Sequence, residues 1–79
     1  LKFEKRAQKE LSKIPAQYQK RILAVFPLIA IDPFSGKKLE GELSDLYSYR
    51  VWPYRIIYKV YKGILVVVII RICHRQGIY

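Results

Sequence analysis

Cysteine is almost absent from this sequence, since Cys73 is the single one among 79 residues. Because one cysteine cannot form a disulfide within the chain, the fold is not expected to depend on an oxidising compartment. We therefore expect a cytoplasmic protein in which Cys73 is a small buried hydrophobic side chain rather than a nucleophile.

Long apolar segments are also missing. The longest apolar run, Ile64 to Ile70, is too short to cross a bilayer, and the N-terminus lacks the apolar core of a signal peptide. No long helix is expected to combine a basic face with a strongly apolar one, as helices on membrane surfaces do. These absences predict a protein without a membrane partner.

Acidic residues are few and lie in one part of the chain. Six Asp and Glu stand against fifteen Lys and Arg, which gives a net charge of +9. No acid follows Asp45, whereas the later residues include six Lys or Arg and His74. Metal-dependent nucleases need clustered carboxylates, so we expect no metal site and no cofactor in this half. The positive charge predicts an anionic partner, first nucleic acid and second an acidic protein segment.

The length of 79 residues allows one domain, which we place at residues 1–79. Folding of so short a chain buries only roughly 60% of the surface of the unfolded chain. The 52% of hydrophobic residues can supply the core that this requires. We expect a domain that folds alone with a small margin of stability.

The N-terminal part of the chain predicts two helices. Apolar positions at helical spacing indicate a first helix from Glu4 to Ile14, which Pro15 ends. The second helix begins near Ala16 and has one broad apolar face, formed by Tyr18, Ile22, Val25, Phe26 and Ile29. Pro27 cannot donate to the Leu23 carbonyl, so a kink or an early stop is expected there.

The rest of the chain predicts a sheet. Asp32 to Gly41 has the breakers of a loop, and Leu1 to Phe3 is a candidate for the end of a further strand. Three strand-like runs follow the loop, namely Leu46 to Val51, Tyr54 to Val60 and Ile64 to Ile72. The order predicts an α+β fold, with two N-terminal helices packed on one face of a small, mostly antiparallel sheet and the other face free for function.

Two arginines are predicted to lie opposite each other on that sheet. If Trp52 and Pro53 form a two-residue turn, Arg50 pairs with Arg55 and both side chains point to the same face. Like charges across a ladder destabilise a sheet unless an anion lies between them. Because the planar guanidinium group binds phosphate in a bidentate way, the pair predicts a phosphate-binding surface.

The loop before the last strand decides whether Arg71 and Arg75 join this pair. A three-residue loop, Tyr61 to Gly63, would put Gly63 in the left-handed conformation and pair Arg55 with Ile69. Arg71 and Arg75 would then share the face of Arg55, whereas a two-residue loop would send them to the other face. We favour the first because it avoids burying arginines beneath the helices.

Without carboxylates, an arginine cluster can still act on RNA. It can favour in-line attack of a 2′-hydroxyl on the adjacent phosphate, provided that some group handles the proton. The candidates are His74, whose ordinary pKa is near neutrality, and Tyr79, whose pKa nearby cations would have to lower. A lone histidine beside Arg75 is more often a surface residue, and a terminal tyrosine is often frayed.

The sequence resembles the RelE-type toxins of the RelE/ParE superfamily over nearly its whole length. The resemblance rests on the order of elements and on three segments, namely Lys38-Leu39-Glu40-Gly41, Tyr54-Arg55-Ile56-Ile57-Tyr58, and His74-Arg75 followed by Tyr79. It implies an mRNA interferase, a ribosome-dependent endoribonuclease that cuts mRNA in the A site and leaves a 2′,3′-cyclic phosphate. It also implies an acidic antitoxin that neutralises the toxin in a hetero-oligomer.

The resemblance also implies roles for single residues. Arg55 matches the strand arginine that contacts the phosphate, Arg75 the arginine that stabilises the developing charge, and Tyr79 the C-terminal tyrosine with base or stacking roles. Arg50 falls where relatives often have a catalytic lysine and Ser48 where some relatives have another lysine, so both are candidate RNA-binding residues, as is Arg71. Arginine keeps the charge but does not give up its proton. Two other readings remain open, a ParE-like toxin that inhibits DNA gyrase and an RNA-binding relative without catalysis.

Overall fold

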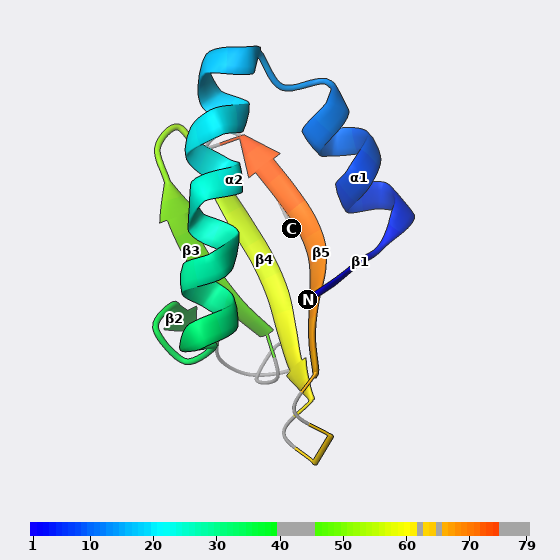
Figure 1. The fold of residues 1–79 in the computed structure, drawn as a ribbon, viewed down its shortest axis with the longest axis vertical. Coiled ribbons are helices and arrows are strands. Elements are labelled where there is room, and N and C mark those ends of the chain that lie inside the picture. Colours follow the sequence, from blue (N-terminus) through cyan, green and yellow to red (C-terminus); the bar gives the residue numbers. More distant parts are fainter. Residues whose placement is uncertain (40–45, 62, 65, 75–79) are drawn as a thin grey trace.

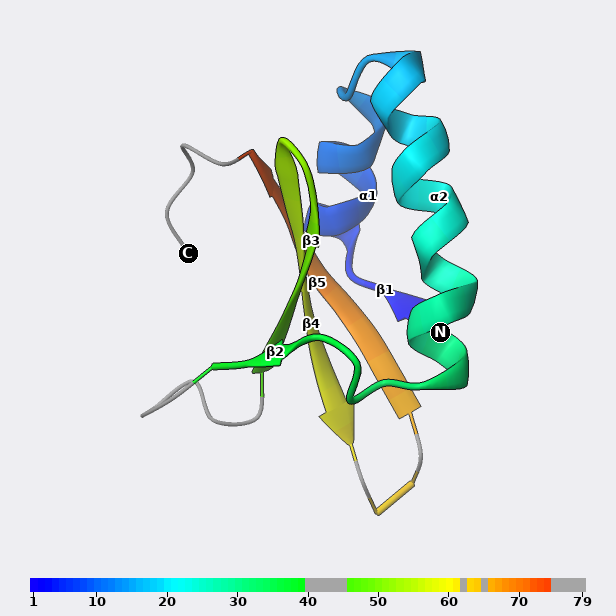
Figure 2. The ribbon, with the colours of Figure 1, turned by 90° about the vertical axis from the view of Figure 1, so that its left-hand side faces the viewer.

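The computed structural model describes residues 1–39, 46–61, 63–64 and 66–74 of the chain. In chain order, the described elements are β1 (Lys2–Phe3), α1 (Lys5–Ser12), α2 (Ala16–Ile31), β2 (Lys37–Lys38), β3 (Leu46–Val51), β4 (Tyr54–Tyr61) and β5 (Val66–His74). The strands form one sheet in the order β1-β5-β4-β3-β2, in which β1 is parallel to β5 and the other neighbours are antiparallel. Both helices lie on the same side of this sheet (Figures 1 and 2). The predicted α+β arrangement is confirmed.

The two helices form where the apolar spacing predicts them. Pro15 separates them, and its carbonyl accepts the N–H groups of Tyr18 and Gln19 in the first turn of α2. The buried face of α2 consists of Ile22, Phe26 and Ile29, with Tyr18 and Val25 partly buried beside them. The predicted apolar face is therefore confirmed.

Of the two outcomes expected at Pro27, the early stop is wrong, because α2 continues to Ile31, and the kink stays a prediction. Proline removes one backbone donor, but the helix resumes its hydrogen bonding beyond it, and the N–H of Asp32 donates to the Leu28 carbonyl. Packing of the neighbouring Phe26 ring against Phe3 of β1, with centroids 4.9 Å apart, holds this turn on the sheet. The packing of Phe26 and Ile29 therefore outweighs the local cost of the proline.

The core lies between α2, α1 and one face of the three long strands. It contains alternate residues of these strands, namely Tyr47, Ile56, Tyr58, Val60, Val67, Ile69 and Ile72. Tyr58 is fully buried, and its hydroxyl donates to the Pro33 carbonyl at 2.8 Å and accepts the Gly36 N–H at 3.2 Å. Burial raises the pKa of the Tyr58 phenol above its ordinary value. This hydroxyl fixes the segment after α2 to the middle of the sheet.

The segment from Asp32 to Gly41 is not loop throughout, since Lys37–Lys38 forms the edge strand β2 against Ser48 and Tyr47. Two lysines carry no apolar alternation, so the sequence gives no strand signal there. The strand forms because Tyr58 holds Gly36 against the sheet. A Cβ at Gly36 would lie 2.5 Å from the Tyr58 hydroxyl and 2.9 Å from the Ser48 carbonyl oxygen, so this approach requires glycine.

The predicted register of the last strand was also wrong. Tyr61 pairs with Val66 and Arg55 with Cys73 rather than Ile69, with a register shift between Ile57 and Tyr58. The connection is longer than three residues, Ile64 is exposed, and Gly63 does not adopt the left-handed conformation. A nearly continuous apolar run shows no alternation, so it cannot specify which residue pairs with which.

Candidate functional site

The sheet face opposite the helices carries basic side chains. Along β3 and β4 the inward residues are Tyr47, Tyr49, Tyr54, Ile56 and Tyr58, which pack in or against the core. Side chains alternate between the faces of a strand. Ser48, Arg50, Arg55 and Lys59 therefore point to the other face, where no helix of the described chain lies (Figure 2).

The opposed arginine pair is present as predicted. Val51 pairs with Tyr54 and Arg50 with Arg55, across a turn whose Trp52–Pro53 peptide bond is cis. Arg50 is exposed, Arg55 is half-buried, and neither forms an ion pair within the described residues. Two guanidinium groups on one face, paired with no carboxylate of the described residues, create a strong attraction for an anion.

The arginine pair lines a cavity of about 120 Å³ together with three neighbours. Its lining residues are Lys37, Leu39, Ser48, Arg50 and Arg55. We call this the arginine cavity. The structure thus brings three of the predicted residues, Ser48, Arg50 and Arg55, into one site.

Lys37 is the residue of this site that the sequence reasoning missed. It pairs with Ser48 across β2 and β3, so its side chain stands on the face of the arginine cavity. Lys37 therefore brings an ammonium group beside Ser48. Lys37 could have been predicted from its position, because it directly precedes the segment Lys38-Leu39-Glu40-Gly41, one of the segments that carry the resemblance.

Arg71 occupies a different environment. It pairs with Ile57, and its Nη2 donates to Glu10 Oε2 of α1 at 2.9 Å, while Glu10 Oε1 accepts the N–H of Ile72 at 3.0 Å. Burial raises the pKa of Glu10, but the hydrogen bonds from Arg71 and Ile72 outweigh it and hold this pKa below its ordinary value. The pair fastens α1 to β5, and an RNA-binding role for Arg71 stays a prediction.

His74 is not brought together with Arg55. It pairs with Tyr54 at the end of β5, and the two rings meet edge to face with centroids 5.3 Å apart. Tyr54 in turn contacts Tyr18 of α2, so His74 lies on the helix side of the sheet. A direct proton transfer between His74 and a phosphate held by Arg55 has no support in this geometry.

The last two predicted residues, Arg75 and Tyr79, lie outside the described residues, and their roles stay predictions. Cys73 stands opposite Arg55 but is buried, as expected, and burial raises the pKa of its thiol above the ordinary value. A thiol held protonated is a poor nucleophile and a poor metal ligand.

Among the described residues, no three His, Cys, Asp or Glu side chains gather as a metal ion would need. Neither helix of the described chain has the length and apolar character that crossing a bilayer requires.

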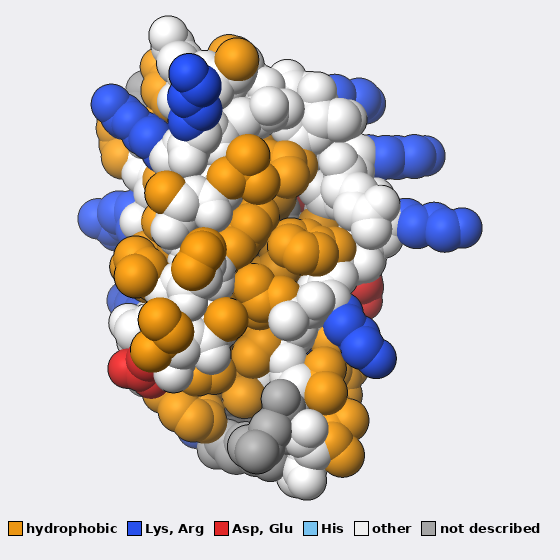
Figure 3. All heavy atoms as spheres, in the orientation of Figure 1, with side chains coloured by type: hydrophobic (Ala, Val, Ile, Leu, Met, Phe, Trp, Pro, Cys, Tyr) orange, Lys and Arg blue, Asp and Glu red, His pale blue; other side chains and the backbone are white. Residues whose placement is uncertain are grey.

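The helix side of the molecule carries a second kind of surface. Figure 3 shows apolar side chains gathered between α1 and α2, along the length of both helices. Two hollows open on it, one of about 380 Å³ lined mainly by Phe3, Leu11, Leu23 and Phe26, and one of about 490 Å³ lined mainly by Leu1, Ala30, Phe34, Val60 and Val67. We call this surface the apolar groove.

Comparisons with known proteins agree on one family. The family model described as the ParE toxin of the type II toxin–antitoxin system parDE matches residues 1–79. The toxin RelG of Mycobacterium tuberculosis is 34% identical over 85 aligned residues, which cover 100% of this chain and 93% of RelG.

Solved structures have the same fold. The RelBE2 toxin–antitoxin complex of M. tuberculosis contains a chain with a TM-score of 0.84 and 30% identity, covering 94% of both chains. The archaeal RelE–RelB complex of Pyrococcus horikoshii matches with a TM-score of 0.80 and 30% identity, covering 98% of this chain and 94% of that one. The isolated RelE toxin of Escherichia coli, 23% identical with a TM-score of 0.82, covers 98% and 84% and shares the fold. The chain therefore belongs to the RelE/ParE superfamily of type II toxin–antitoxin toxins.

Proposed function

We propose that this toxin is a metal-independent endoribonuclease that cleaves mRNA in the A site of the ribosome. The observation that carries the proposal is the arginine cavity, in which Lys37, Arg50 and Arg55 converge without a carboxylate within the described residues. Its relatives include a protein named as the toxin RelG and structures named as RelE toxins. A cluster of fixed cations is suited to hold a phosphodiester and to stabilise charge that develops on it.

The reaction proposed for the cavity uses the RNA as its own nucleophile. The 2′-oxygen attacks the adjacent phosphorus, a base takes the 2′-hydroxyl proton, and the bond to the 5′-oxygen breaks as that oxygen receives a proton. The products are a 2′,3′-cyclic phosphate and a 5′-hydroxyl end. Arg55, which is half-buried and therefore held more firmly, contacts the scissile phosphate and offsets its growing negative charge.

The remaining residues have supporting roles in this proposal. Arg50 is exposed at the rim and positions the RNA, because a guanidinium group does not transfer its proton. Lys37, which pairs with Ser48, supplies a second positive charge that contacts the phosphate beside Arg55. Arg75 is proposed to stabilise the transition state, and Tyr79 to handle the proton or stack on the RNA, as in the family.

The partner proposed for the toxin is an acidic antitoxin. Related toxins are seen in complexes with antitoxins, among them RelBE2 of M. tuberculosis and RelE–RelB of P. horikoshii. An antitoxin segment with an apolar stripe would cover the apolar groove, and its acidic residues would neutralise the basic face. Such a segment is expected to fold as it binds.

Ribosome dependence is tested by comparing substrates. The purified toxin is incubated with mRNA on programmed ribosomes and with the same mRNA alone, and the products are mapped by primer extension. Cleavage at the A-site codon on ribosomes, with little cleavage of free mRNA, is expected. Equal cleavage of both would contradict an A-site enzyme.

The description of the matching family model favours a second candidate, a ParE-like inhibitor of DNA gyrase. The same preparation is therefore added to a gyrase supercoiling assay. Inhibition of supercoiling together with intact mRNA on ribosomes would replace the nuclease proposal with the gyrase one.

A further inference from the structure

A third hollow lies at the end of the sheet, beside the turn between β3 and β4. It measures about 300 Å³ and is lined by Gln17, Tyr18 and Arg21 of α2 and by Trp52 and Pro53 of the turn. Figure 1 shows this turn next to the first turns of α2. We call it the tip pocket, and neither the arginine cavity nor the apolar groove includes its residues.

The tip pocket combines flat rings with a cation. Trp52 is 59% exposed, which is unusual for so large an apolar side chain. The Arg21 guanidinium lies 6.0 Å from the centre of the Tyr18 ring. Among the described residues, no acidic side chain lines the pocket or stands in the first turn of α2. The pocket is therefore suited to bind a flat ring that has a negatively charged group attached to it.

We propose that the tip pocket holds one unstacked base of single-stranded RNA, stacked on Trp52 with its phosphate near Arg21. Aromatic platforms beside cations bind single-stranded nucleic acid because every base has a π-face. A hollow of this size holds about ten waters, enough for a purine, which has about ten non-hydrogen atoms. This inference rests on the proposed function, which supplies the RNA.

The position of the pocket ties it to the arginine cavity. Trp52 follows Arg50 by two residues in the sequence. Trp52 lies in the turn after β3, and two residues of chain span at most about 7 Å, so the two side chains begin within about that distance of each other. Because residues of α2 line the pocket, a strand whose phosphate lies on Arg50 and Arg55 places a neighbouring nucleotide there by passing around the tip of the hairpin. The pocket would fix the direction in which the RNA crosses the cavity.

The single tryptophan of the chain makes a direct test possible, because Trp52 alone accounts for its tryptophan fluorescence. Purified toxin is titrated with a short 2′-O-methyl RNA, which cannot be cleaved, and with an abasic chain of the same number of phosphates. Stacking should quench the Trp52 emission with the RNA and leave it nearly unchanged with the abasic chain. Equal quenching by both, or none while fluorescence anisotropy of labelled RNA reports binding, would overturn the proposal.

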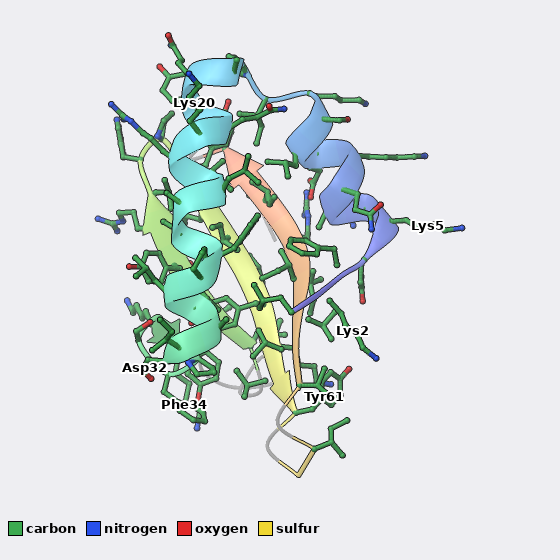
Figure 4. All side chains as sticks on the ribbon, viewed as in Figure 1. Lys2, Lys5, Lys20, Asp32, Phe34 and Tyr61 are labelled. Carbon is green, nitrogen blue, oxygen red and sulfur yellow. The ribbon has the colours of Figure 1, made fainter. Side chains whose placement is uncertain are left out.

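Variants test the same contact without relying on Trp52 emission. Trp52→Ala and Arg21→Gln should each weaken binding of the labelled RNA by about ten-fold, whereas Trp52→Phe should keep most of the affinity. The matched control is Tyr61→Ala. Tyr61 is 42% exposed with the Lys59 ammonium 4.8 Å from its ring centre. Figure 4 shows it at the opposite end of the molecule from Lys20, the neighbour of Arg21.

We expect Trp52→Ala and Arg21→Gln to lose affinity for the RNA and Tyr61→Ala to keep it. Circular dichroism should show that all the variants are folded. Equal losses in the control, or parental affinity of Trp52→Ala and Arg21→Gln, would show that the pocket takes no base. Quenching by an acidic antitoxin peptide and not by RNA would also overturn the proposal. Base-dependent quenching by a toxin that does not cleave on ribosomes would count against the nuclease and leave the pocket supported.

Discussion

At the scale of single residues, the two paired arginines differ in environment although they stand side by side. Arg55 is half-buried near the start of β4, whereas Arg50 is exposed near the end of β3. A partly buried cation is less mobile and less screened by solvent than an exposed one, so its field acts more strongly on a bound phosphate. Arg55 should therefore matter more for the chemical step and Arg50 more for binding.

The first prediction is that Arg55→Ala loses cleavage while Arg50→Ala mainly loses affinity. Removing a fixed charge aimed at the transition state costs roughly 3 to 4 kcal/mol, a factor of about a hundred to a thousand in rate. Single-turnover cleavage on programmed ribosomes at saturating toxin separates the two effects, because saturation removes the binding step. If Arg55→Ala cleaves at the parental rate under saturation, its assignment is wrong.

The second prediction concerns Lys37, which brings an ammonium group to the arginine cavity beside Ser48. Lys37→Gln should slow cleavage by about ten-fold or more, and Lys37→Arg should restore most of the rate if charge is what the residue supplies. Lys38→Gln is the matched control, since Lys38 pairs with Tyr47 and lies outside the cavity. Failure of Lys37→Arg to restore the rate would instead indicate proton transfer by Lys37.

At the scale of elements, the fold depends on two contacts that no local sequence pattern predicts. Glu10 joins α1 to β5, and Tyr58 with Gly36 brings β2 to the sheet edge. The hairpin of β3 and β4 was predictable, because alternation and a short turn fix its register. The pairing of β5 and the existence of β2 were not, since they depend on residues distant in the sequence.

The third prediction is a pH dependence of stability caused by Glu10. Its pKa is lowered in the folded state, so it stabilises the fold above its unfolded pKa, and this contribution disappears as the pH falls through the folded pKa. Glu10→Gln should lower the melting temperature by about 5 to 10 °C at neutral pH, for a loss of about 1 to 2 kcal/mol. The difference from the parent should shrink in acid, at a pH below the ordinary pKa of glutamate.

Thermal unfolding followed by circular dichroism measures this difference, with Glu4→Gln as the control. Glu4 is exposed and directly precedes the same helix, and the pKa of Glu10 does not depend on it. A Glu10→Gln deficit that is the same at both pH values would show that the carboxylate charge is not what fastens α1 to β5.

The fourth prediction is that Gly36→Ala damages the site through β2. The added Cβ would meet the Tyr58 hydroxyl and the Ser48 carbonyl, so β2 must move away and carry Lys37 with it. Cleavage should fall by about ten-fold, as for Lys37→Gln, and the protein should be less stable by about 1 to 3 kcal/mol. Gly63→Ala is the control, because a Cβ there meets nothing within 4 Å. Equal effects of both substitutions would contradict this role of Gly36.

At the scale of the whole molecule, the sheet separates two surfaces of different character. The arginine cavity lies on one face of the sheet, and the helices, which lie on the other side (Figure 2), present the apolar groove (Figure 3). The net charge of +9 favours RNA on the first surface, and a folding antitoxin segment can use both. Activity and neutralisation should therefore be separable by mutation.

The fifth prediction follows from this separation. Leu23 is 51% exposed on α2 and lines the apolar groove, so Leu23→Glu should weaken antitoxin binding by at least about ten-fold and leave cleavage on ribosomes unchanged. Co-purification with the antitoxin and the cleavage assay measure the two properties. Unchanged antitoxin binding by Leu23→Glu would show that the antitoxin segment does not bind in the apolar groove.

The sequence predicts the layers, the helix face and the arginine pair because each depends on spacing within a short segment. It does not predict that His74 faces α2 through Tyr54, or that Arg71 turns to Glu10, because both follow from the register of β5. Lys37 joins the site only when Tyr58 and Gly36 have placed β2. The features that the sequence does not predict are those that depend on contacts between residues distant in the chain.

The central claim is that the arginine cavity promotes attack by the 2′-hydroxyl of the RNA, and the ends of the cleaved mRNA test it most directly. The product of a single turnover on programmed ribosomes is treated with polynucleotide kinase and with phosphatase, and its ends are read by mobility and labelling. We predict a 2′,3′-cyclic phosphate and a 5′-hydroxyl, produced by the parent and by Lys38→Gln but not by Arg55→Ala. A 5′-phosphate with a 3′-hydroxyl would contradict the claim.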